Sequence, residues 1–121
     1  MKIKIKDTYE VSLYIGSVNE ETKEVFSRDD LIKEIALFQE SQPQTIPVRV
    51  TETLFISETD YAEVGWELAV ISYPRIETKQ TYLVLFMKKL ALRLLDNLKQ
   101  KRICVVTPSD TVMYENHRFE Q

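Results

Sequence analysis

The sequence is poor in cysteine, histidine and glycine, and each shortage excludes a class of site. Cys104 is the single cysteine, so the chain cannot form an internal disulfide. His117 is the single histidine, so one chain lacks the several His or Cys ligands of a zinc site. The two glycines, Gly16 and Gly65, belong to no glycine-rich phosphate loop. We therefore expect no metal site and no cofactor.

Long apolar runs and a strong net charge are also missing. The longest apolar run, residues 82–87, is far too short to cross a bilayer. Lysines interrupt the first six residues, where a secretory signal would need an apolar stretch. The formal net charge is −3, so general attraction to nucleic acid is not expected. These features predict a cytoplasmic protein with no membrane or nucleic-acid partner.

Length and composition indicate one folded unit. The chain has 121 residues, of which 44% are hydrophobic and 29% are charged, as in ordinary globular proteins. A chain of this length can bury enough surface to form a core without disulfides. We expect a single α+β domain over residues 1–115 and a C-terminal tail over residues 116–121.

Alternation of apolar and polar residues predicts the strands of this domain. Four core strands are expected at residues 11–15, 48–56, 66–73 and 103–106. Weaker patterns leave open an extra edge strand at each end of the domain, at residues 2–6 and 111–115. Residues 57–64 are acidic and are expected to be a connection.

Two helices are predicted between these strands. Ser27 is a good N-cap with Asp30 three residues later, as in a capping box, and Phe26 and Leu31 have the spacing of a hydrophobic staple. The second helix is longer and runs from residue 78 or 79 to 100, with apolar residues at helical spacing.

The order strand–helix–strand–strand–helix–strand resembles the ferredoxin-like plait, βαββαβ. This resemblance implies a four-stranded antiparallel sheet with both helices on one face. It carries no function by itself, because this fold hosts many unrelated activities.

Two surfaces of such a domain are too apolar to face water comfortably. Leu85 and Leu92 lie seven residues apart on the outer side of the second helix, and Ile71 and Val106 lie on the open sheet face. Single exposed leucines are common, so a bland surface is the alternative for the helix. We expect these four residues to contact a second copy, because homo-oligomers are the usual assembly of small chains.

A group of polar residues on or beside the strands is the best place to look for a ligand. Its members are Tyr14, Arg49, Glu67, Tyr73 and Arg75. Two arginines can grip a phosphate or carboxylate, and Glu or Tyr can transfer protons. Cross-strand ion pairs explain the same residues and are the preferred interpretation.

No stretch of the sequence carries a recognisable catalytic motif. The leading hypothesis is therefore a small non-enzymatic binding or protein-interaction module that works as a homo-oligomer, a profile found among accessory proteins of bacteria, phages and mobile elements. Two alternatives stay open. One is a sensor or sequestering protein for a small anionic ligand, and the other is a small acid–base enzyme with a cleft at the sheet face.

Overall fold

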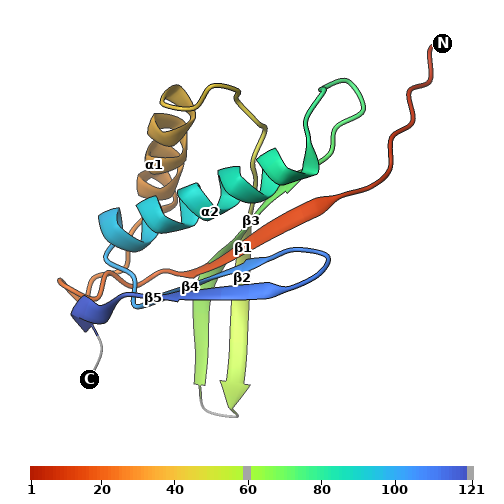
Figure 1. Cartoon of the computed structure of the whole chain (residues 1–121). Helices are drawn as coiled ribbons and strands as arrows, with labels where there is room; N and C mark the ends of the chain where they lie inside the picture. The colour runs from red at the N-terminus through yellow and green to blue at the C-terminus, as the bar shows by residue number, and fades with distance from the viewer. Residues whose placement is uncertain (59–60, 120–121) are drawn as a thin grey trace.

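The computed structural model describes residues 1–58 and 61–119 and contains a sheet covered on one face by two helices (Figure 1). All strand pairs are antiparallel. The expected α+β class is confirmed. In chain order the elements are β1 (Glu10–Gly16), α1 (Arg28–Glu40), β2 (Arg49–Glu58), β3 (Tyr61–Ile71), α2 (Gln80–Asn97), β4 (Arg102–Val106), β5 (Thr111–Glu115) and the short 3₁₀ helix η1 (His117–Phe119).

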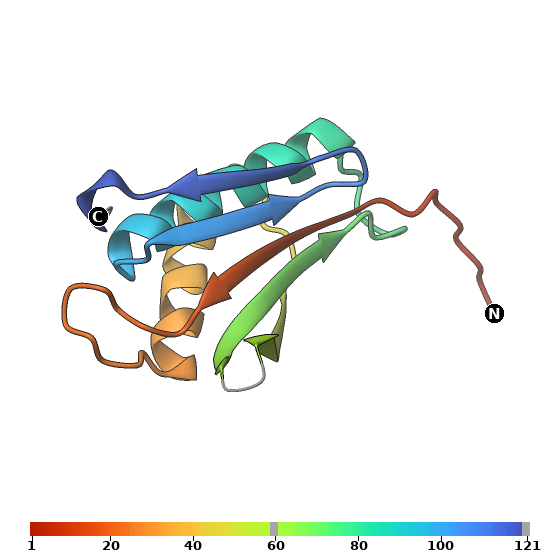
Figure 2. The same cartoon turned by 90° about the horizontal axis from the view of Figure 1, so that it is seen from below.

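The described sheet has five strands in the order β2-β3-β1-β4-β5, so the expected four-stranded plait is not confirmed. The extra strand is β5, which lies at the C-terminal edge where one was thought possible. The N-terminal edge strand that the sequence left open at residues 2–6 does not form. That segment leaves the sheet (Figures 1 and 2) and is exposed, because no described strand pairs with it.

The core lies between the sheet and the helices. Val11, Leu13 and Ile15 on the central strand β1 are each 1% exposed or less. The residues between them, such as Ser12 and Tyr14, point to the opposite face because strand side chains alternate. Figure 2 looks onto that face, which neither helix covers.

The two helices follow the sequence patterns, with one difference at the end of α2. The Ser27–Asp30 capping box forms as predicted, and Phe26 and Leu31 are both buried. Helix α2 ends at Asn97 rather than residue 100. Lys99 takes a left-handed φ of 50° at this point and turns the chain toward β4.

The connection expected at residues 57–64 is instead mostly strand. Strands β2 and β3 form a long hairpin whose far end projects beyond the helices (Figure 1). Leu54 pairs with Val64 and Ile56 with Ala62, so the pairing continues through the acidic stretch. Residues 59 and 60, which belong to the expected connection, lie outside the described part of the chain.

Residues 117–119 of the expected tail form the turn η1, and residues 120–121 lie outside the described range. Within the described residues, none of the helices has the length and apolar character needed to cross a membrane.

Candidate functional site

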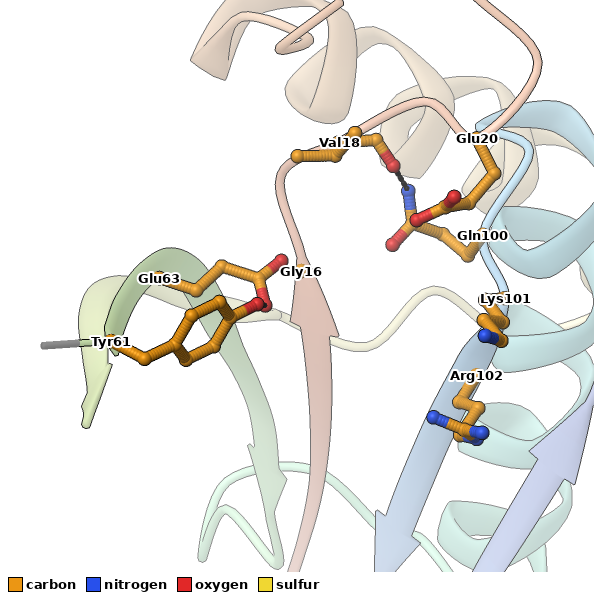
Figure 3. Close-up of a pocket in the computed structure, with 8 residues that line it drawn as sticks. All are labelled: Gly16, Val18, Glu20, Tyr61, Glu63, Gln100, Lys101 and Arg102. Atoms are coloured by element: carbon orange, nitrogen blue, oxygen red, sulfur yellow. Dashed lines mark hydrogen bonds between the residues drawn. The ribbon is translucent and has the colours of Figure 1, made fainter. Parts of the chain in front are cut away.

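A cavity of about 320 Å³ opens at the end of β1 (Figure 3). Three segments that are far apart in the sequence meet there: the end of β1 with the loop after it, the start of β3, and the turn from α2 into β4. The lining residues are Gly16, Val18, Glu20, Tyr61, Glu63, Gln100, Lys101 and Arg102. The volume lies within the range typical of small-molecule sites, about 300–1,000 Å³.

Gly16 makes room for an acidic side chain on one wall of this cavity. A Cβ atom at residue 16 would lie 2.7 Å from Oε1 of Glu63, closer than such atoms approach. The phenol of Tyr61 donates a hydrogen bond of 3.4 Å to Oε2 of the same carboxylate. Residues 61 and 63 lie on the same side of β3 because strand side chains alternate. The carboxylate is therefore held between a phenol and a bare backbone.

The turn after α2 builds the opposite wall. The amide N–H of Lys99 bonds to the carbonyl of Asp96, and that of Gln100 to the carbonyl of Leu95. These two bonds, with the left-handed residue between helix and strand, form a Schellman motif. The side chain of Gln100 is buried and donates to the carbonyl of Val18 at 2.9 Å, which ties this turn to the loop after β1.

The cavity has charges of both signs. Lys101 and Arg102 lie on the wall opposite Glu63 and Tyr61 (Figure 3). The carboxylate of Glu20 pairs with Lys23 at 2.6 Å. A ligand in this cavity would therefore meet the carboxylate of Glu63 on one side and, on the other, two basic groups together with the paired carboxylate of Glu20.

Four of the five residues expected to bind a ligand lie near one another on the open sheet face. Strand pairing places Tyr14 opposite Glu67. Arg49 forms an ion pair of 2.6 Å with Glu10. It also lies close enough to Glu67 and Tyr73 for their negatively charged forms to raise its pKa. Arg49 on β2 therefore takes part in an ion pair with a residue of β1, as the interpretation preferred from the sequence expects for it. The fifth residue, Arg75, lies exposed in the turn between β3 and α2.

Two members of this group, Tyr14 and Arg49, have raised pKa values. Burial is the largest cause that raises the pKa of Tyr14 above its ordinary value, followed by the negative charges of Glu67 and Glu10. The hydrogen bond to Glu10 raises the pKa of Arg49 above its already high value. Tyr14 also packs edge-on against Phe55, with ring centres 6.0 Å apart.

The four residues expected at an interface are all at least partly accessible. Leu85 and Leu92 are 49% and 50% exposed on the outer side of α2, and Ile71 and Val106 are half-buried on the open sheet face. What contacts them stays a prediction.

The cavity itself was missed by the sequence reasoning. Gly16 and Gln100 are 84 positions apart, and no short motif joins them to Glu63. One signal was present: with only two glycines in the chain, a glycine at a strand end indicates a close approach. The structure groups no three potential metal-ligating residues within its described part.

Solved structures give the comparison with known proteins. The fold is similar to a phage SAM lyase in complex with S-methyl-5'-thioadenosine, with a TM-score of 0.66 and 11% identity over 99% of this chain and 98% of the other. It is also similar to a phage SAM lyase in the apo state, with a TM-score of 0.72 and 13% identity over 93% and 92% of the two chains. No protein-family model matches the chain. No curated protein matches it by sequence. At this identity the likeness shows the fold alone.

These neighbours correct the leading hypothesis. A non-enzymatic interaction module was expected because no catalytic motif is visible in the sequence. That expectation, and the leaning against an enzyme, are contradicted by two structural neighbours that are both lyases, which are enzymes. Short sequence motifs do not reveal this cavity, because its lining comes from distant segments of the chain.

Proposed function

We propose that this chain is an enzyme that cleaves S-adenosylmethionine (SAM) and releases S-methyl-5'-thioadenosine. The observation that carries the proposal is the fold likeness to a SAM lyase with that compound over nearly the full length of both chains. A likeness of this extent includes the elements that line the cavity, so the cavity is the natural place for the reaction.

The two compounds identify the bond that breaks. S-Methyl-5'-thioadenosine keeps the adenosine, the sulfur and the methyl group of SAM and lacks its amino-acid chain. The bond between sulfur and the γ-carbon of that chain is therefore cleaved, and its electron pair stays on sulfur. In exchange, the γ-carbon forms a bond to an oxygen of the substrate's own carboxylate, which closes a five-membered lactone and needs no water or other co-reactant. Sulfur changes from a positively charged sulfonium to a neutral thioether, so it needs no proton to leave.

The charges of the cavity suit the reacting end of SAM. That end carries a positive sulfur and, three carbons away, a negative carboxylate beside a positive α-ammonium group. Glu63 offers a counter-charge to the sulfonium, and Lys101 and Arg102 offer donors to the carboxylate. Placed in this way, the substrate has its breaking bond between the two walls, where its orientation is held from both ends.

We also propose that β1–β4 with the two helices correspond to a ferredoxin-like plait to which β5 has been added. The order β2-β3-β1-β4 and the position of both helices on one face support this description.

The proposal is tested by incubating the purified protein with SAM and measuring S-methyl-5'-thioadenosine by liquid chromatography. We expect product well above the slow breakdown of SAM without protein. Arg102→Gln removes one donor to the substrate carboxylate and is expected to lower kcat/KM by about 10–100-fold, the value of a lost charged hydrogen bond.

Lys89→Gln is the matched control, because Lys89 is an exposed basic residue on α2 that does not line the cavity. It should leave kcat/KM unchanged. Product formation no faster than in buffer alone would contradict the proposal.

A further inference from the structure

The cavity is lined by two carboxylates, those of Glu20 and Glu63. Among residues 1–58 and 61–119, no basic side chain forms an ion pair with Glu63. The other acidic lining residue, Glu20, is paired with Lys23 at 2.6 Å. Glu63 has a phenol as its hydrogen-bond partner and is half-buried. A partly buried carboxylate without a cation attracts a positively charged ligand more strongly than a paired one does.

The position of this carboxylate is set by two neighbours. Gly16 lies beneath Oε1 and leaves no side chain in its way, and Tyr61 donates to Oε2. Figure 3 shows the carboxylate and the phenol of Tyr61 together beside Gly16 at the cavity. The Tyr61 ring adds a second surface that favours a cation.

A sulfonium ion has no N–H or O–H group, so a protein recognises it through its charge. A carboxylate beside an aromatic ring provides that recognition, and a neutral thioether of the same shape gains nothing from it. We propose that Glu63, positioned by Gly16 and Tyr61, makes this site select ligands with a positive charge at the sulfur position over neutral thioethers. This inference rests on the proposed function. The same selection favours release of the product, because cleavage removes the positive charge on sulfur that Glu63 attracts.

The experiment compares two ligands that do not react. Sinefungin carries a protonated amine where SAM has its methylsulfonium, and S-adenosylhomocysteine has a neutral thioether at the same place. Isothermal titration calorimetry gives the ratio of their dissociation constants. For the unaltered protein we expect sinefungin to bind about tenfold more tightly, as for a cation that gains a partly desolvated charge contact.

Two variants test the residue, and two serve as controls. Glu63→Gln keeps the shape and removes the charge, so the ratio should fall to within about twofold of unity. Gly16→Ala keeps the charge and displaces the carboxylate, so the ratio should fall as well. Glu40→Gln and Glu52→Gln, which change exposed carboxylates outside the cavity lining, should keep the original ratio. Thermal melting of each variant establishes that it is folded.

The outcomes separate this inference from the proposed function. If the unaltered protein cleaves SAM but binds both ligands equally, or if folded Glu63→Gln keeps the tenfold preference, the charge selection is wrong and the lyase proposal stands. If neither ligand binds and SAM is not cleaved, the proposed function itself fails.

Discussion

Gly65 lies where two strands and an aromatic ring leave no space for a side chain. A Cβ atom there would be 2.5 Å from the carbonyl oxygen of Ile15 and 2.7 Å from the ring of Phe55. Because the first contact is with backbone, Gly65→Ala should lower the free energy of unfolding by about 2 kcal/mol, as for overpacking in a core. Urea denaturation monitored by circular dichroism measures this loss.

Gly16→Ala provides the matched comparison for that prediction. Its new Cβ would meet the end of the flexible Glu63 side chain, which can move aside. The expected loss is below about 1 kcal/mol. Equal losses at the two glycines would show that the contact with the backbone of Ile15 is not the deciding one.

Tyr14 gives a prediction about pH. Its pKa in the folded chain is raised above 10.0, first by burial and then by Glu67 and Glu10. As the pH rises, the unfolded chain loses this phenol proton before the folded chain does, so stability falls from about pH 10 upward. The difference in phenolate absorbance between the unaltered protein and Tyr14→Phe should have its midpoint above pH 10.0.

Removing one of the two charges tests the cause of this shift. In Glu67→Gln the midpoint of the Tyr14 titration should move down but stay above 10.0, because burial of the phenol still raises its pKa. A midpoint that does not move would exclude Glu67 as a source of the raised pKa.

At the scale of single residues, the sequence could predict which way a strand residue faces but not which residues form the cavity. Alternation with a period of two places Tyr14 and Glu67 on one face, and the pairing of β1 with β3 puts them opposite each other. Glu63 and Gly16 meet only because of the register of that same pairing. Register depends on contacts along the whole strand and leaves no local motif.

At the scale of elements, the capping box of α1 is visible in the local sequence, and its contribution to the free energy of unfolding can be measured. The Oγ atom of Ser27 accepts from the amide of Asp30 at 3.1 Å, and Oδ2 of Asp30 accepts from the amide of Ser27 at 3.1 Å. Ser27→Ala should lower the free energy of unfolding by about 1 kcal/mol, because it leaves the amide N–H of Asp30 without its acceptor. Ser27→Asp restores a capping acceptor and should recover most of it. A full loss with Asp would show that the cap is not the cause.

Elements that depend on distant partners were predicted less well. Residues 2–6 alternate like a strand, but no described strand pairs with them, so alternation alone was insufficient. Residues 57–58 and 61–64 of the acidic stretch join the β2–β3 hairpin because each strand supplies the other's hydrogen bonds. The end of α2 was placed too late because Lys99 occupies the left-handed position where glycine is the usual signal.

At the scale of the whole molecule, the class of fold was accessible from sequence and the function was not. Helix caps, apolar periodicity and element order are local properties that add up to an α+β chain. The proposed cleavage of SAM belongs to the complete fold, because the cavity needs segments that start near residues 16, 61 and 100. The homo-oligomer expected from Leu85, Leu92, Ile71 and Val106 stays a prediction.

The projecting β2–β3 hairpin has a consequence for how copies of this chain behave at high concentration. Strand β2 is an edge of the described sheet, and Leu54 and Ile56 on it are 56% and 68% exposed. An apolar edge of this kind invites the addition of a strand from another molecule, the first step of aggregation. Glu52 precedes and Glu58 follows the two apolar residues along the strand, and their charges repel an incoming copy. Resistance to aggregation thus depends in part on two carboxylates that take no part in the cavity.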